Sequence, residues 1–407
     1  MTDNRTNPNA RILQGLTVLD FTRVMAGPLC TRLMADLGAR VIKIERPGEG
    51  DEMRRAPAPL PGEGDHSTYF ARRNAGKQSV AINLAADAGR ALALDLVARS
   101  DIVVENFAPG VMTRLGCDYA ACRAVNPSVL YCSISGYGQT GPDARQGAFA
   151  HVVAASSGVM HLDAGDLEPR TSHLQAADAL AGAYGFGALM AALWRRERTG
   201  EGAQIDVSML EAMLSGEDLA FGTVPNGVPA EPGPRAGMGL SPVHGRWVAW
   251  QSGGSPALFP RLCEAMGAPE MQHDPRFATG PDRRDNWALL QELVSAWLAT
   301  FVDVDAALAA LRAARIPCAL LRTPDEVVNS AQLQHREAFV PVSHGDHGDV
   351  LVTTSPYRID GLPVLPSGPA PYAIGADTQA VLHDLAGLDD AAIRALEDSG
   401  AIVRGDS

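Results

Sequence analysis

Short apolar runs alternate with segments of helical periodicity through the first half of the chain. Residues 16–22 and 40–45 are predicted strands, and residues 29–37 are predicted to form the helix between them; together they have the size of a βαβ unit. The same pattern predicts further strands over 79–84, 101–105, 129–134 and 201–207, and helices over 87–99, 111–115 and 208–219. Strands that alternate with helices are typical of an α/β fold with a doubly wound parallel sheet.

A stretch rich in proline and glycine interrupts this pattern. Pro225, Pro229, Pro232 and Pro234 fall within residues 222–242, which are predicted to be a loop, and we place a domain boundary at 222. The remainder predicts helices over 257–266, 287–300, 304–314, 381–385 and 390–399, and short strands at 247–250 and within 338–360. Another stretch rich in glycine and proline, residues 48–68, is predicted to be an exposed loop.

One carboxylate stands apart in the sequence. Asp178 is the only charged residue between Arg170 and Arg195. The residues that follow it, 179–194, are small and apolar on nearly every face, which predicts a buried helix. Asp178 is therefore expected at the N-terminal end of that helix, where an aspartate either caps the helix or acts as a catalytic carboxylate. Taken alone, the pattern favours the cap.

Charge and composition narrow the class of protein. The 407 residues carry a net charge of −13, which argues against nucleic acid as a partner. The first 125 residues hold 16 basic and 14 acidic residues, whereas the rest hold 18 and 33, so a polyanionic small molecule is expected to bind the first third. Six cysteines without a Cys-x-x-Cys motif indicate a reduced compartment, and we expect a cytoplasmic protein. No signal peptide or membrane span is expected.

The turns after the first two predicted strands lie at residues 23–27 and 46–50. Ligands of parallel sheets bind outside the carboxyl ends of the strands, so both turns are expected at one rim. Gly27 is the only glycine in the first turn, and the Gly-x-Gly-x-x-Gly pattern of nicotinamide dinucleotide sites is absent. His344 and His347 lie in a Gly-Asp repeat whose spacing fits no familiar metal-ligand pattern, and we predict a polar hairpin loop there.

Several separate motifs carry a family resemblance. They are Gly15-Leu-Thr-Val-Leu-Asp-Phe-Thr, Ala26-Gly-Pro, Leu37-Gly-Ala-Arg-Val-Ile-Lys-Ile-Glu-Arg-Pro, Asn74-Ala-Gly-Lys-Gln-Ser, Val104-Glu-Asn-Phe-Ala-Pro-Gly, Ser135-Gly-Tyr-Gly, Arg198-Thr-Gly-Glu-Gly and Asp274-Pro-Arg-Phe-Ala. Through them, from about residue 13 to residue 402, the chain resembles the family III CoA-transferases. That family includes formyl-CoA transferase and carnitine CoA-transferase, and alpha-methylacyl-CoA racemase is a relative.

The resemblance implies an architecture that periodicity does not reveal. It implies a Rossmann-like large domain, whose N-terminal part is residues 1–221, a smaller α+β domain at 222–335, and a return of the chain to the large domain at 336–407. It also implies an interlocked homodimer with each active site between subunits.

The resemblance also implies a reaction and a role for Asp178. In the family, an aspartate just before the buried helix attacks an acyl-CoA, forms an aspartyl anhydride and then an enzyme–CoA thioester, and passes CoA to an acceptor acid. The implied partners are an acyl-CoA and a carboxylic acid. Coenzyme A is a substrate in this scheme, and no permanently bound cofactor or metal is expected.

The motifs also imply which residues bind CoA. The first turn supplies Arg23, Val24, Met25 and Ala26. The others follow later strands and are Arg46, Ile82, Asn106, Phe107, Arg114, Leu115 and Tyr137. Arg46 and Arg114 are expected to contact phosphate, and Ile82, Asn106 and Phe107 to lie near adenine.

The chain departs from its relatives at three places. Met25 stands where transferases of the family often carry a polar residue. Phe149-Ala150 replaces an aromatic-acid or His-Asp pair, which leaves the acceptor end more apolar and removes the histidine that a racemase needs, unless His151 takes its place. Gly237-Met-Gly239 is either a closing loop or a plain turn. The alternatives to a transferase are a 2-methylacyl-CoA racemase or isomerase, a CoA-dependent lyase, and a non-catalytic acyl-CoA-binding protein.

Overall fold

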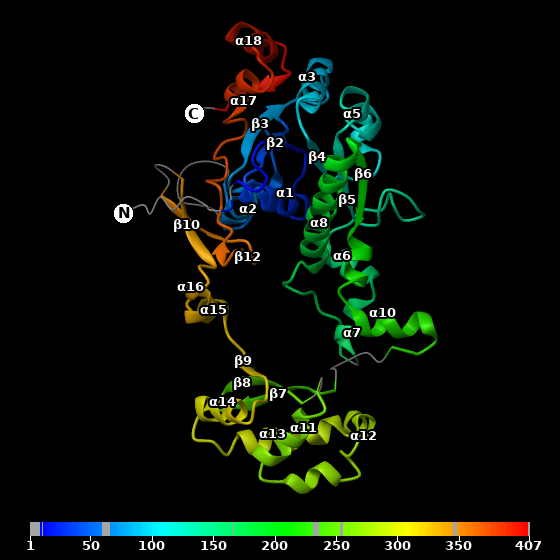
Figure 1. Ribbon diagram of the computed structural model, residues 1–407, viewed down its shortest axis with the longest axis vertical. Helices are drawn as coiled ribbons and strands as arrows, with labels where there is room; N and C mark the ends of the chain where they lie inside the picture. Colours follow the sequence, from blue (N-terminus) through cyan, green and yellow to red (C-terminus); the bar gives the residue numbers. More distant parts are fainter. Residues whose placement is uncertain are drawn as a thin grey trace. The chain divides into compact units, whose positions relative to one another are not determined.

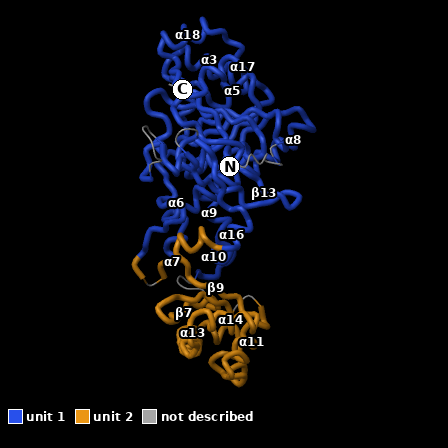
Figure 2. Tube along the Cα trace, turned by 90° about the vertical axis from the view of Figure 1, so that its left-hand side faces the viewer, with its two compact units in different colours: residues 1–161, 169–230, 331–407 blue, residues 162–168, 231–330 orange. Residues whose placement is uncertain are grey.

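The computed structural model describes residue 9 and residues 11–58, 66–165, 167–230, 236–252, 255–344 and 348–405. The chain divides into two compact units (Figure 2). The large unit comprises residues 1–161, 169–230 and 331–407, and the small unit comprises residues 162–168 and 231–330. The boundary therefore lies later than residue 222, because the helix that includes residue 222 belongs to the large unit.

A seven-stranded sheet forms the large unit, in the order β14-β3-β2-β1-β4-β5-β6. The strands β1 to β6 are parallel to one another. The strand β14 lies at the edge of the sheet and pairs antiparallel with β3. The strand bounds are Thr17–Asp20 (β1), Arg40–Glu45 (β2), Gln78–Ile82 (β3), Ile102–Glu105 (β4), Leu130–Ser135 (β5), Ala203–Ser208 (β6) and Ile402–Val403 (β14). The order reverses between β1 and β4, so the sheet has a switch point there. The predicted α/β fold with a parallel sheet is confirmed.

Helices cover both faces of this sheet (Figure 1). Consecutive side chains of a strand point to opposite faces, and Val18 packs in the core beneath α1 and α8, whereas Leu19 packs in the core beneath α3 and α5. Both cores are fully buried, which explains why the strands read as continuous apolar runs. The helix bounds on these faces are Ala26–Asp36 (α1), Asp87–Ala98 (α3), Tyr119–Val125 (α5), Ala150–Ser156 (α6), Ala176–Thr199 (α8) and Met209–Leu214 (α9).

The long helix α8 differs from its prediction. Its buried positions form one stripe, of Ala177, Ala181, Gly185 and Leu189 with Gly182 beside it, and pack against α1 and the sheet. The opposite side is open, with Tyr184 49% and Trp194 67% exposed. The prediction of a helix buried on all sides is therefore wrong. This helix is also the one in the described residues that is long and apolar enough to cross a membrane, a property that core helices share.

Glycine lets α1 and α8 approach each other closely. A Cβ at Gly182 would lie 2.5 Å from the carbonyl oxygen of Ala26 and 3.2 Å from the side chain of Leu29. Atoms at such a distance overlap, so any larger residue at 182 would push the two helices apart. The N-terminal ends of the two helices thereby come together.

Several shorter elements complete the large unit. The predicted helix 208–219 is broken at 215–217, because Glu217 turns its carboxylate back to cap the next helix at Ala220. Residues 48–58 form the predicted exposed loop only in part, since Asp51 and Arg54 are buried. These further elements are Glu52–Arg55 (η1), Thr68–Asn74 (α2), Val111–Arg114 (α4), Asp218–Thr223 (α10) and Val224–Asn226 (η2).

The C-terminal segment of the large unit follows the small unit. It holds two antiparallel pairs, β10 with β11 and β12 with β13, before β14 enters the main sheet. Its elements are Ala331–His335 (α16), Phe339–Ser343 (β10), Asp349–Thr353 (β11), Arg358–Ile359 (β12), Leu362–Pro363 (β13), Thr378–Asp384 (α17) and Asp390–Asp398 (α18). The predicted hairpin loop at His344–His347 lies mostly outside the described residues.

The small unit has a core of its own, formed by helices on a three-stranded antiparallel sheet. Its first strand includes residues 238–242, which had been predicted to be loop, and a Cβ at Gly239 would lie 2.1 Å from the Trp250 ring. Its elements are Val159–Ala164 (α7, whose first residues belong to the large unit), Met238–Val243 (β7), Arg246–Gln251 (β8), Leu258–Ala265 (α11), Pro269–His273 (η3), Gly280–Asp285 (α12), Trp287–Leu298 (α13), Val304–Ala313 (α14), Cys318–Leu320 (β9) and Pro324–Val328 (α15).

Candidate active site

The carboxyl ends of the parallel strands form the edge where the predicted residues gather. Arg23 follows β1 and Asn106 follows β4, so they flank the switch point of the sheet. The side chain of Asn106 donates to the carbonyl of Arg23 and accepts from its N–H, both at 2.8 Å. The Arg23 guanidinium also lies over the Phe107 ring, 5.1 Å from its centre. Three predicted CoA-binding residues thus form one connected surface.

The turn between β1 and α1 has a strained backbone. Val24 has φ 66°, in a region that β-branched residues rarely adopt. Its N–H donates to the carboxylate of Asp51 at 3.2 Å, and that carboxylate also pairs with Lys43 at 2.9 Å. Position 27 requires glycine, because a Cβ there would lie 2.3 Å from the side chain of Thr22. The strain is therefore maintained by contacts from segments distant in the sequence.

Both lysines of the chain form buried ion pairs beneath this turn. Lys43 pairs with Asp51, and Lys77 pairs with Asp20 at 2.9 Å, and all four side chains are fully buried. The Lys43 ammonium also donates to the carbonyl of Thr22 at 2.6 Å. Buried charges of this kind require a partner, so these lysines support the turn and leave ligand anions to arginine.

Asp178 lies where helix N-termini converge. It is the third residue of α8, and the N-cap of that helix is Gln175, so the N-cap interpretation is wrong. Instead, the backbone N–H groups of Ala26 and Ala150 act on its carboxylate and favour the charged form. These residues are the first of α1 and α6, and first-turn N–H groups have no partner within their own helices. The positive ends of three helices therefore meet at one carboxylate.

Burial and charge act on Asp178 in opposite directions. Burial raises the pKa of this carboxyl above its ordinary value, while the N–H of Ala26, the charge of Arg73 and the N–H of Ala150 lower it. Tyr69 lies nearby, since its hydroxyl donates to the side chain of Gln175 at 2.8 Å. The Asp178 side chain is only partly covered and stays accessible to a reactant.

The other predicted CoA contacts differ in exposure. Met25 and Ala26 are buried at the start of α1, and Tyr137 is half-buried, with its hydroxyl 3.0 Å from that of Ser156. Ile82 is 1% exposed within the core, and its side chain offers no surface to a ligand.

The two arginines predicted to contact phosphate are both exposed. Arg46 pairs with Glu49 at 3.0 Å at the end of β2, and Arg114 closes the short helix α4 after β4. Leu115, the next residue, packs against the core beneath α3. Both guanidinium groups are therefore free to move onto a ligand at this edge.

The residues at the departures have defined places. Phe149 is the N-cap of α6 and is 59% exposed, and His151 is exposed on the same helix, without a hydrogen bond to any described residue. Gly237 and Gly239 lie at the start of β7 in the small unit. Within the described ranges, no group of three or more His, Cys, Asp or Glu side chains could hold a metal ion.

Three groups that contribute to the site around Asp178 and the turn beside it were not predicted from the sequence. The N–H of Ala150 carries no residue-specific signal, because any residue except proline supplies it. Asp51 was assigned to an exposed loop. The sequence gives Arg73 no signal that distinguishes it from other arginines, and its relation to Asp178 depends on how α2 packs.

Comparison with known proteins agrees with this arrangement. The profile of CoA-transferase family III matches residues 13–378. Acetyl-CoA:oxalate CoA-transferase of Acetobacter aceti is 36% identical over 364 residues, which cover 85% of this chain and 89% of the relative. Succinyl-CoA:glutarate CoA-transferase of Mus musculus is 31% identical over 402 residues, 96% of this chain and 90% of the relative.

Solved structures agree as well. A CAIB/BAIF family protein from Brucella suis superposes with a TM-score of 0.78 at 30% identity, covering 92% of this chain and 99% of that one. A Mycobacterium tuberculosis protein superposes with the same TM-score at 27% identity and the same coverage. The chain therefore belongs to CoA-transferase family III, and it is an enzyme that transfers CoA from an acyl-CoA to a carboxylic acid.

Proposed function

We propose that the enzyme transfers CoA through covalent intermediates on Asp178. The observation that carries this proposal is the position of Asp178 in the first turn of α8, where the N–H groups that begin α1 and α6, of Ala26 and Ala150, favour its charged form. A carboxylate held by fixed donors can attack a thioester, and the same donors can stabilise the negative oxygen that develops during each attack.

The reaction balances without a proton or an electron from outside. An Asp178 oxygen attacks the donor carbonyl, the C–S bond breaks, and an aspartyl anhydride and CoA thiolate form. The thiolate attacks the Asp178 carbonyl, which releases the donor acid as a carboxylate and leaves an aspartyl-CoA thioester. The acceptor carboxylate attacks this thioester to form a second anhydride and thiolate. Attack of the thiolate on the acceptor carbonyl yields the new acyl-CoA and restores Asp178.

The proposed CoA site is the carboxyl edge of the sheet. The connected surface of Arg23, Asn106 and Phe107 offers an aromatic face and a guanidinium beside the turn that leads to Ala26. Arg46 and Arg114 add exposed guanidinium groups along the same edge, which suits the phosphates of CoA. Since α1 begins at this turn, a pantetheine arm bound there can reach Asp178.

We further propose that the working form is a homodimer. Large apolar side chains around Asp178 and along α8 are exposed in the single chain, and an apolar surface of this extent is expected to be covered by a partner. The exposed fractions are 71% for Leu174, 59% for Phe149, 49% for Tyr184 and 67% for Trp194.

A panel of acids tests the reaction. The purified enzyme is mixed with acetyl-CoA or succinyl-CoA and a panel of carboxylic acids, beginning with oxalate and glutarate, for which the relatives are named. We expect new thioesters by mass spectrometry, and a hydroxamate or a borohydride-reduced alcohol at Asp178 when the enzyme–CoA thioester is trapped.

The controls separate the nucleophile from the binding site. Asp178→Ala is expected to lower turnover at least about a thousandfold, because a covalent route is lost. The variant should still bind CoA, since its fold and the sheet edge are unchanged. Full activity of Asp178→Ala, or the absence of exchange with every acid, would refute the proposal.

A further inference from the structure

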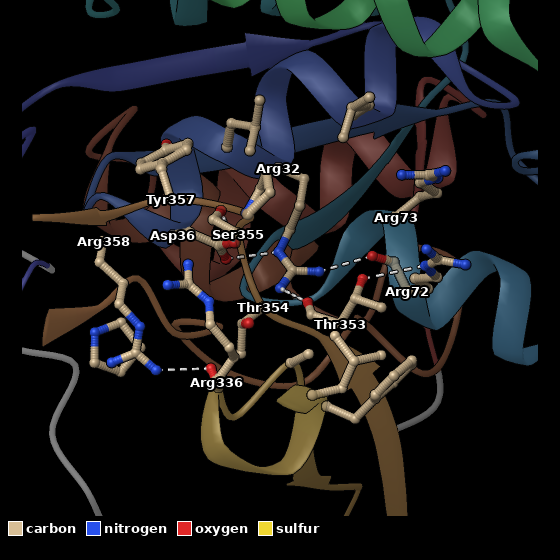
Figure 3. A pocket seen from close by; sticks show the side chains of 17 residues that line it. Arg32, Asp36, Arg72, Arg73, Arg336, Thr353, Thr354, Ser355, Tyr357 and Arg358 are labelled. Carbon is tan, nitrogen blue, oxygen red and sulfur yellow. Dashed lines mark hydrogen bonds and ion pairs between the residues drawn. The ribbon is translucent and has the colours of Figure 1, made fainter. Parts of the chain in front are cut away.

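A cavity in the large unit is lined by positive charge. It measures about 460 Å³, is partly open to solvent, and is lined by α1, α2, the segment around Arg336, the end of β11 and the segment that follows β11 (Figure 3). Five guanidinium groups line it, and the only acid among its walls is Asp36. The arginines are Arg32, Arg72, Arg73, Arg336 and Arg358. A cavity lined by five guanidinium groups and one carboxylate is suited to an anion.

Three of the five guanidinium groups already have partners. Arg32 pairs with Asp36 at 2.6 Å and donates to the carbonyl of Arg72. Arg72 donates to the hydroxyl of Thr353 at 3.1 Å, and Arg358 donates to two backbone carbonyls. These contacts form the cavity wall seen in Figure 3.

Arg73 differs from these three. Its side chain makes no hydrogen bond or ion pair with any residue that the structure describes, although it is partly buried. Burial lowers the pKa of this guanidinium to about 10, so it remains a cation at neutral pH. A partly buried cation without a hydrogen-bonded partner loses part of its solvation, and an anionic ligand would compensate that loss.

The position of α2 brings Arg73 close to the proposed nucleophile. Tyr69 and Arg73 are one helical turn apart and therefore lie on the same side of α2. Tyr69 contacts Gln175, the N-cap of α8, and the charge of Arg73 acts on the Asp178 carboxylate. Leu29, which lines the cavity, also packs against α8 one turn beyond Asp178, at Gly182.

The cavity extends away from the proposed CoA site. The helix α1 begins at the carboxyl edge of the sheet and runs back toward the amino ends of the strands. The cavity follows α1 along Leu29, Arg32, Leu33 and Asp36, in the direction opposite to the strand ends. A ligand group held there therefore belongs to the acid and not to the nucleotide.

We propose that this cavity binds the remote carboxylate of a dicarboxylic acid, which pairs with Arg73 while its other carboxylate meets the Asp178 thioester. The inference rests on the proposed function of Asp178. A guanidinium presents two parallel N–H groups that match a carboxylate. Leu29 and Leu33 supply apolar wall for the methylene groups between the two ends of the acid. Arg73 is thus a residue that determines specificity.

Kinetics with matched acids test the inference. The wild-type enzyme, with acetyl-CoA as donor at mildly alkaline pH, is given glutarate or pentanoate, and then adipate or hexanoate. The kcat/KM for each diacid should exceed that for its monoacid by about a hundredfold, which corresponds to one buried charged hydrogen-bond pair. Arg73→Gln should reduce that ratio, because kcat/KM should fall more for the diacids than for the monoacids, and Arg73→Lys should restore part of it.

The controls distinguish this inference from the reaction itself. Arg99→Gln changes an exposed arginine on α3, which covers the opposite face of the sheet, and should leave every acid unaffected. If the Asp178–CoA thioester forms but diacids and monoacids are used equally, the inference fails while the proposed function stands. If Arg73→Gln instead raises the KM for acetyl-CoA without discriminating between acids, the cavity binds a phosphate of CoA and the inference is overturned. Absence of the thioester would refute both proposals.

Discussion

Opposing effects act on the ionisation of Asp178. Burial raises the pKa of its carboxyl, and two backbone N–H groups and the Arg73 guanidinium lower it again. Only the ionised carboxylate has an oxygen able to attack a thioester, so the proposed chemistry requires a deprotonated Asp178. The net result is a pKa above the ordinary value of an aspartate.

This balance predicts the pH dependence of the first attack. The kcat/KM for the acyl-CoA donor should fall as the pH decreases through the raised pKa of Asp178, because the protonated form is inactive. Removing the positive charge in Arg73→Gln should raise that pKa further and move the acid limb to higher pH. The profiles are measured on both enzymes within the range where circular dichroism shows a constant fold. An identical acid limb in both would contradict the electrostatic link between the two residues.

At the scale of elements, the site depends on how closely two helices pack. The N–H of Ala26 reaches Asp178 because α1 and α8 nearly touch at Gly182, where the carbonyl oxygen of Ala26 would lie 2.5 Å from a Cβ. The obstructing atom is backbone and cannot rotate away. The closeness of the helices therefore sets the distance between the donor and the carboxylate.

We expect Gly182→Ala to lower kcat by about a hundredfold, because displacing reacting groups by about 1 Å has an effect of this size. The matched control is Gly187→Ala on the same helix, where an added Cβ would meet nothing within 4 Å. That variant should keep full activity and gain about 0.5–1 kcal/mol in stability, since alanine favours helix. Steady-state kinetics and chemical denaturation measure both. Equal effects of the two substitutions would show that helix composition matters and not the approach of α1.

At the scale of the whole molecule, the sheet also brings together segments that are far apart in the sequence. The sheet order brings the ends of β1 and β4 together across the switch point, although 81 residues separate Asp20 from Ile102 along the chain. The C-terminal strand β14 then covers the edge at β3. The proposed site therefore draws on most of the length of the large unit.

The proposed homodimer is a prediction at this scale. Light scattering coupled to size-exclusion chromatography should give the mass of two chains. Trp194→Glu places a charge on the exposed side of α8 and should shift the population toward the monomer, whereas Val302→Glu, at an 84% exposed position of the small unit, serves as the control. A wild-type enzyme that is a monomer at all concentrations would refute the dimer.

Much of this arrangement could be predicted from local pattern. The strand at 40–45 was placed residue for residue, and the helices at 87–99 and 304–314 within one residue, because their apolar periodicity is set by near neighbours. The helix at 208–219 was not, since its break depends on a cap at Glu217 that competes with a continuous apolar pattern. The exposed side of α8 was also missed, because composition reports how apolar a face is and not what covers it.

The sequence by itself determined the α/β pattern, the motifs that carry the family resemblance, and Asp178 as the isolated carboxylate before a long apolar helix. Only the tertiary structure decided what surrounds that carboxylate. The N–H groups of Ala26 and Ala150 and the guanidinium of Arg73 come from three helices far apart in the chain. Their convergence follows from strand order and from the close packing at Gly182, and such long-range contacts leave no local periodicity in the sequence.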